Sequence, residues 1–214
     1  MPLEEIRVVL AAPDTAARNA GIAAHPRHME RHLEQTRATV ASLRRLLEEP
    51  PPTIAVEYRS IPPAHVFGLR SRVAMDDVGQ WWGAAFDQLH EALTIAGLQR
   101  SGPDSALYPA EFFQAGLGEV TAFIPVTGGP GPSRQPGVLE LPGAELAVAV
   151  HRGAFDDLDT TYGALGGFVT ERAIGVDGPI RENYMVSAYD TADEARHQTE
   201  VCWPEFLTAP AASR

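Results

Sequence analysis

The sequence predicts an α+β fold in which two β-α-β-β units form one antiparallel sheet with two helices on one face, preceded by an N-terminal coiled-coil helix. Three observations predict it. The second half of the chain repeats the first, each half alternates β-rich runs with one helical run, and residues 27–49 carry a heptad pattern. A repeat is informative because one copy of such a unit rarely buries its own apolar face.

The repeat is clearest between residues 58–84 and 138–164, which align at a constant offset. Pro62 aligns with Pro142, and Asp76-Asp77 aligns with Asp156-Asp157. Further along, GPDSALY, which ends at Tyr108, aligns with GPIRENY, which ends at Tyr184. We therefore expect one duplicated domain with units at residues 53–126 and 138–206, and not a solenoid of many repeats.

Composition narrows the class of protein. The formal net charge of −11 argues against a nucleic-acid-binding surface, because phosphate contacts need clustered basic residues. The single cysteine, Cys202, excludes an internal disulfide and is typical of a reducing compartment. No apolar run is long enough to cross a membrane, and residues 1–20 lack the basic start of a signal peptide. We expect a cytoplasmic protein that binds no membrane.

Residues 1–50 are predicted to form a helical tail. A short helix at residues 3–12 ends before Pro13-Asp14, and a longer one spans residues 27–49. Its seam has the four–three spacing of a two-stranded coiled coil: Met29, Leu33, Thr36, Val40, Leu43 and Leu47. Both a homodimerisation helix and an amphipathic helix packed on its own domain fit this pattern. The prolines at 50–52, which detach the helix from the duplicated domain, favour the homodimer.

Unit one begins with two β-rich runs around Pro62-Pro63. Asp76-Asp77 is predicted to cap a helix that ends near Gly97. After a Ser-Gly-Pro turn, residues 107–113 (LYPAEFF) and 119–126 (EVTAFIPV) are predicted to form a strand hairpin. The helix has one apolar face, made of Val78, Trp82, Phe86 (or Ala85), Leu89, Leu93 and Ala96.

Unit two comes after a Gly- and Pro-rich linker at residues 127–137. A strand-like run is followed by a helix at about residues 158–174 and by two strands within 180–189 and 198–206. Three glycines weaken this helix by up to about 1 kcal/mol each relative to alanine. The two units are expected to join about a pseudo-twofold axis. The sheet face without helices, or the groove at the axis, is then left for a ligand or a partner.

No specific catalytic motif is present. The sequence has no phosphate-binding loop, nucleophile elbow or dinucleotide fingerprint. His25, His28 and His32 lie on neighbouring turns of a predicted helix, but no further ligand of obvious type accompanies them. We therefore expect no metal and no cofactor.

Polar residues of the last two predicted strands are the candidates for a site. Strand alternation puts Glu182 and Tyr184 on one face of their strand, and it puts Glu200 and Cys202 on one face of the next strand. If the strands are neighbours, both glutamates point into one cavity; solvation on an open sheet face is the alternative for each. The expected aromatic wall consists of Tyr184, Tyr162, Trp82, Tyr108, Phe112 and Trp203, although Trp82 also suits the core. Such a pocket raises the pKa of a carboxyl group and attracts lipophilic cations.

These features resemble a known family. The duplicated β-α-β-β plan, the Gly-Pro-x-x-x-x-Tyr and Thr-Glu-Val-x-x-Pro endings and the Asp-Asp-capped helix resemble the GyrI-like small-molecule-binding domain, here residues 53–208. Residues 1–50 resemble the tail of a MerR-family regulator with its dimerisation coiled coil. The DNA-binding head of that family is missing from the sequence, so we expect no DNA binding by this chain alone.

The resemblance implies an effector domain that binds hydrophobic, often cationic or aromatic drugs around a central glutamate. Glu182 or Glu200 would take that role, with Tyr184 beside it. The chain would then sense drugs for a MerR-type regulator or sequester them on its own. Two alternatives stay open: hydrolysis of strained electrophilic natural products by a Glu/Tyr pair, and inhibition of a protein such as gyrase.

Overall fold

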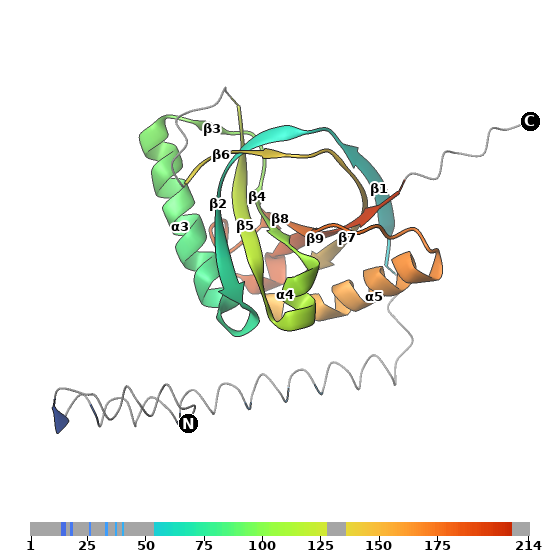
Figure 1. The fold of residues 1–214 in the computed structure, drawn as a ribbon, viewed down its shortest axis with the longest axis horizontal. Coiled ribbons are helices and arrows are strands. Elements are labelled where there is room, and N and C mark those ends of the chain that lie inside the picture. The colour runs from blue at the N-terminus through green and yellow to red at the C-terminus, as the bar shows by residue number, and fades with distance from the viewer. Residues whose placement is uncertain are drawn as a thin grey trace, which may run out of the picture. The chain divides into compact units, whose positions relative to one another are not determined.

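The computed structural model describes residues 54–127 and 136–206, together with isolated positions between 14 and 40 (Figure 1). The chain divides into two compact units, Met1–Pro51 and Pro52–Arg214, and the labelled strands and helices belong to the second. Apart from those isolated positions, the predicted coiled-coil helix lies outside the described residues, as do His25, His28 and His32.

Strands and helices alternate as in two similar halves. The strands are β1 (Val56–Ile61), β2 (Ala64–Ala74), β3 (Gln99–Arg100), β4 (Asp104–Tyr108), β5 (Leu117–Thr127), β6 (Gly137–Leu141), β7 (Ala144–Arg152), β8 (Ile180–Val186) and β9 (Gln198–Glu205). The helices are α3 (Val78–Ala96), α4 (Ala110–Ala115) and α5 (Leu158–Glu171), with short 3-10 turns η1 (Met75–Asp77), η2 (Phe155–Asp157) and η3 (Glu194–Arg196).

The nine strands form one sheet in the order β1-β7-β9-β8-β4-β5-β2-β6, with β3 paired to β5. Every pairing within it is antiparallel. The first strand of each half crosses to the other half, since β1 pairs with β7 and β6 pairs with β2. In the middle, β4 pairs with β8 and joins the halves. The sheet is thus nearly symmetric about the β4–β8 pair.

Both long helices pack on the same face of the sheet. Tyr184 and Ile180 point to one face of β8, because they are four residues apart in a strand. Tyr184 belongs to the apolar cluster under α3, with Phe86 and Leu89, whereas Ile180 belongs to the cluster under α5. Figure 1 shows α3 at the left, beside β2, and α5 at the lower right, next to α4. The central strands β4 and β8 therefore lie between the two helices.

The predicted fold class is confirmed, including the antiparallel sheet and the two helices on one face. Helix α3 ends where expected, because Gly97 takes the left-handed conformation (φ +64°) that suits glycine. No helix in the described part of the chain is long and apolar enough to cross a membrane.

One predicted strand is wrong. The sequence predicts a strand over residues 107–113, but β4 ends at Tyr108, and Pro109 is the N-cap of the short helix α4. Proline has no N–H to donate to a strand ladder and readily starts a helix. Phe112 consequently lies on α4, where it is buried, and not on a strand.

Candidate functional site

A cavity of about 400 Å³ lies between the helices and the central strands. Its walls come from α3, α4, α5, η2, η3 and the loop after β8, and its floor from β4 and β8. Seven aromatic side chains line it: Trp82, Tyr108, Phe112, Phe113, Phe155, Tyr162 and Tyr184. A concave, mostly aromatic cavity of this size is typical of a small-molecule site.

Glu182 is the buried acid of this cavity, with 6% of its surface exposed. The Tyr162 hydroxyl donates to its Oε1 at 2.6 Å, and the Tyr184 hydroxyl donates to its Oε2 at 2.8 Å. The hydroxyls of Tyr108 and Tyr184 lie 2.9 Å apart. Because Tyr184 donates to Glu182, Tyr108 must donate to Tyr184. Three tyrosines thus form a chain of donors that ends on one carboxyl group.

Burial dominates the acid–base properties of this group. It raises the pKa of Glu182, and the two tyrosine hydrogen bonds, which favour the ionised form, lower it less. The pKa values of Tyr108, Tyr162 and Tyr184 are raised well above their usual range, first by burial and next by the charge of Glu182. The three hydroxyls therefore stay protonated and act as donors.

The charges around the cavity are acidic. Asp156 and Glu194 are exposed members of its lining, in addition to the buried Glu182. Among the described residues that line the cavity there is no arginine, and the sequence has no lysine. A positively charged group in the cavity would therefore meet carboxylates and aromatic faces without a competing arginine or lysine.

The internal repeat explains where the site lies. Tyr108 and Tyr184 occupy equivalent positions of the two units, and so do Trp82 on α3 and Tyr162 on α5. The position equivalent to Glu182 is Ala106, and these two residues face each other in the β4–β8 ladder. The cavity therefore sits where the two halves meet. The carboxyl group is the feature that breaks its symmetry.

Six of the eight sequence-predicted site residues line the cavity. They are Glu182, Tyr184, Tyr162, Trp82, Tyr108 and Phe112. Trp82 is partly buried and serves both the core and the cavity, since it packs on Phe86 and on Tyr184.

Glu200 does not share the cavity with Glu182. In the β8–β9 ladder Glu200 faces Asn183, whereas Glu182 faces Val201, so the two glutamates point to opposite faces of the sheet. Glu200 is instead held by Arg59 of β1, whose Nη1 and Nη2 lie 2.9 and 3.1 Å from its two oxygens. Asn183 donates to it at 2.9 Å. The expectation of one cavity for both acids is corrected, because the strand register is offset by one residue.

Trp203 also lies elsewhere, on a second groove along α5. Its ring approaches Gly166, where an added Cβ would meet it at 3.3 Å. Gly166 of α5 therefore makes room for this tryptophan.

Other residues of the cavity lining were not predicted as site residues, among them Phe113, Phe155, Glu194 and His197. Phe155 precedes Asp156-Asp157 and is the counterpart of Met75 in the repeat, so the alignment carried a signal for it. Phe113 lies on α4, in a segment for which the sequence predicts a strand. Glu194 and His197 lie in the connection between β8 and β9, which differs from its counterpart between β4 and β5, where α4 lies, and no pattern indicated them.

The comparisons with known proteins agree with this geometry. The family model described as the GyrI-like small molecule binding domain matches residues 55–204, and the chain belongs to this family. No curated protein sequence matches it.

Several solved structures share the fold. A cryo-EM structure of the MerR-family protein EcmrR on DNA has a TM-score of 0.65 at 18% identity and covers 97% of this chain and 78% of that chain. The crystal structure of the EcmrR C-terminal domain has a TM-score of 0.62 at 20% identity, over 71% and 96%. The structure of SAV2435 bound to tetraphenylphosphonium has a TM-score of 0.50 at 13% identity, over 72% and 94%. At such identities the likeness concerns the fold.

Proposed function

We propose that this domain binds hydrophobic small molecules that carry a positive charge, with the Glu182 carboxylate as the counter-charge. One observation carries the proposal: a buried carboxyl group, held by two tyrosine hydroxyls, lies in a cavity of about 400 Å³ lined by aromatic rings. Burying a carboxylate without a cation is costly, so a cationic ligand supplies what the cavity lacks.

The aromatic lining supports the same class of ligand. Faces of tryptophan and tyrosine attract cations by roughly 0.5–2 kcal/mol each, more when water is excluded. Delocalised lipophilic cations lose little hydration on entering such a cavity, unlike an ammonium ion. SAV2435, which shares the fold, is bound to tetraphenylphosphonium in its structure, and this cation is therefore a suitable first probe.

The biological role that we propose is drug sensing. The likeness to EcmrR, which was determined on DNA, supports a role as the effector-binding part of a MerR-type transcriptional regulator. A stand-alone protein that sequesters drugs would use the same cavity. In both cases the ligand leaves unchanged, and the protein would act on antibiotic resistance through binding alone.

Hydrolysis is the second candidate, and the tyrosine–glutamate arrangement favours it over other chemistries. A carboxylate can take a proton from an attacking water. A tyrosine hydroxyl can donate a proton to the leaving oxygen or carbon when a strained ring opens. However, both oxygens of Glu182 already accept a hydrogen bond from a tyrosine, which makes the carboxylate a weaker base toward a water. Binding of a cation does not require the carboxylate to act as a base.

Titration of tryptophan fluorescence with tetraphenylphosphonium tests the proposal, because Trp82 lines the cavity. We expect saturable quenching in the wild type and in Trp203→Phe, whose ring lies outside the cavity, and loss of most of the signal change in Trp82→Phe. A lack of saturable binding to the folded protein would contradict the proposal and favour a protein-inhibitor role.

Mass spectrometry of the recovered ligand separates the two chemical candidates. The test uses an epoxide-bearing lipophilic cation in place of tetraphenylphosphonium, since the latter has no strained bond. We expect the compound to return intact. A gain of one water at catalytic protein concentration would instead make the domain a hydrolase.

A further inference from the structure

The loop between β8 and β9, residues 187–197, forms one wall of the cavity and is named the wall loop. It contributes Ala188, Glu194 and His197 to the lining. Its opposite side contacts α3, which contributes Trp82 to the same cavity. The wall loop therefore borders the cavity that holds Glu182 and connects it to α3.

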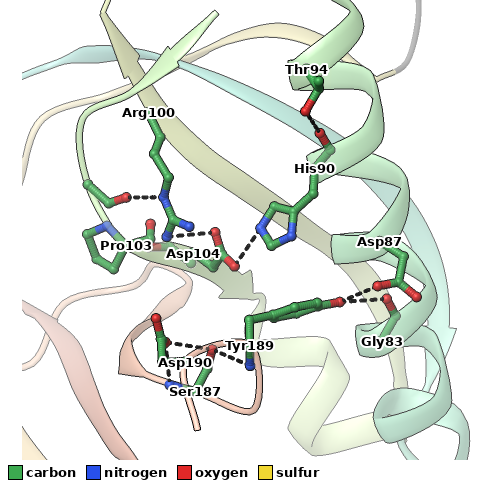
Figure 2. Close-up of polar contacts among 12 residues, drawn as sticks. Gly83, Asp87, His90, Thr94, Arg100, Pro103, Asp104, Ser187, Tyr189 and Asp190 are labelled. Carbon is green, nitrogen blue, oxygen red and sulfur yellow. Dashed lines mark hydrogen bonds and ion pairs between the residues drawn. The ribbon is translucent and has the colours of Figure 1, made fainter.

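Tyr189 fastens the wall loop to α3 (Figure 2). Its hydroxyl donates to Oδ1 of Asp87 at 2.7 Å and lies 3.3 Å from the carbonyl oxygen of Gly83. In the described part of the chain, all hydrogen bonds between the wall loop and α3 come from this one hydroxyl. Yet Tyr189 is 42% exposed, so solvent can compete for the contact.

The Tyr189 ring packs against His90, whose side chain is held in place by Asp104; these two residues are named the platform. The ring centroid lies 4.7 Å from that of His90 on α3, edge to face at 72°. His90 is itself held in place, because its Nε2 lies 2.9 Å from Oδ2 of Asp104, a residue with 2% exposure. Arg100 binds the other oxygen of Asp104 at 3.1 Å, as Figure 2 shows. The platform is thus anchored to β4 and does not depend on the loop.

Tyr189 also touches the cavity wall from behind. Its ring lies 5.7 Å from the ring of Trp82 at an interplanar angle of 31°. The other neighbours of Trp82 are Phe86, Phe155 and Tyr184. Of these aromatic neighbours, only Tyr189 belongs to the wall loop. Movement of the loop away from α3 would therefore remove one support of the Trp82 ring.

The wall loop is tied together within itself, which lets it move as a unit. Asp190 accepts hydrogen bonds from the backbone N–H of Ser187 at 2.8 Å and from its hydroxyl at 3.1 Å. At the other end, Nε2 of His197 donates to the carbonyl oxygen of Thr191 at 2.9 Å. These bonds can persist when the contact between Tyr189 and α3 breaks.

We propose that Tyr189 is the latch of the cavity: it fastens the wall loop to α3, holds Trp82 in place, and its release controls how fast ligands enter and leave. This inference rests on the proposed function. A latch differs from an ordinary wall residue in its kinetics, because it slows entry and exit alike, whereas a wall contact slows exit alone.

Stopped-flow fluorescence with tetraphenylphosphonium tests the inference. Tyr189→Phe keeps the ring and removes the hydroxyl, Asp87→Asn weakens the acceptor, and Tyr58→Phe is a matched control on an exposed tyrosine of β1. We expect the association and dissociation rate constants of Tyr189→Phe to rise by about tenfold each, as for loss of one hydrogen bond to a charged group. The dissociation constant should change by less than about threefold, because both rates change together.

The double variant Tyr189→Phe/Asp87→Asn should show no further acceleration, since both changes remove the same contact. Unchanged rates in Tyr189→Phe and Asp87→Asn would overturn the inference. So would a rise in the dissociation rate constant alone, which would make Tyr189 a wall residue. Absence of binding by the wild type would instead contradict the proposed function itself, and the two failures are distinguishable.

Discussion

At the scale of single residues, Glu182 is subject to two opposing influences. Burial favours its neutral form, whereas the hydroxyls of Tyr162 and Tyr184 favour the ionised form. Burial dominates and the pKa of Glu182 is raised, so Glu182 holds its proton more readily than an exposed glutamate does. An entering cation favours the ionised form. Cation binding is therefore expected to release a proton.

The pH dependence of binding is a consequence of this linkage. Below the raised pKa of Glu182 the carboxyl group is neutral and attracts a cation weakly, so affinity for tetraphenylphosphonium should increase as pH rises through that value. Tyr162→Phe removes a hydrogen bond that lowers the pKa, and it should move the rise in affinity to higher pH. Calorimetric titrations over a pH series measure both effects. An identical profile in Tyr162→Phe would contradict this role of the hydroxyl.

Single residues also mark the limit of what the sequence could predict. Alternation within one strand correctly placed Glu182 with Tyr184, because side chains in a strand repeat every two residues. The relation between Glu182 and Glu200 depends on the register between two strands, which no local pattern contains. The register pairs Glu182 with Val201, and a shift of one residue would have reversed the outcome.

At the scale of elements, strand β1 depends on a polar network on the opposite face of the sheet. Arg59 of β1 reaches over β7 to bind Glu200 of β9, which is 8% exposed, and Asn183 of β8 donates to the same carboxylate. An edge strand has only one neighbour to hold it. This side-chain network therefore supplements the single ladder between β1 and β7.

Arg59→Met should lower the free energy of unfolding by about 2 kcal/mol, because it leaves a buried carboxylate without its strongest partner. The arginine side chain is 34% exposed, so solvent reduces the loss. Denaturant unfolding measures the change. Affinity for tetraphenylphosphonium should be unaltered, since the network lies on the face away from the cavity. A weakened affinity without a loss of stability would contradict this separation of the two faces.

The elements themselves were predictable where their signals are strong. Asp77 and Gly97 hold the N-cap and C-cap positions of α3, although the Asp77 side chain does not accept the expected capping hydrogen bond, and the β-rich runs became strands. Residues 107–113 were not predictable by composition, because their aromatic side chains favour a strand while Pro109 favours a helix start. The observed structure follows the signal of the proline: Phe112 and Phe113 lie on α4 and line the cavity.

At the scale of the whole molecule, duplication creates the site. Two similar halves meet at β4 and β8, and equivalent residues such as Tyr108 and Tyr184 come together there. The alignment of the two halves in the sequence therefore predicted the groove at the axis as one possible site. It could not reveal the wall loop, since the corresponding connection of unit one, between β4 and β5, forms the helix α4 instead.

The heptad seam at residues 27–49 leads to a prediction about assembly. We propose that it joins two copies of the chain, in which case Leu43→Asp places a charge in the seam and should make the protein monomeric. Sedimentation of the wild type and of Leu43→Asp measures the mass directly. A dimer that persists in the variant, with the same affinity between copies, would exclude this helix as the contact.

The central claim is that the Glu182 carboxylate balances the charge of a bound cation. The most direct measurement compares the affinities of wild type and Glu182→Gln for tetraphenylphosphonium and for neutral triphenylphosphine oxide, with Glu140→Gln on β6, outside the cavity lining, as the control. We predict that Glu182→Gln lowers the affinity for the cation by about tenfold or more and the affinity for the neutral ligand by much less. Glu140→Gln should change neither affinity. Equal losses for the cation and the neutral ligand would contradict the account, because Glu182 would then shape the cavity without contributing its charge.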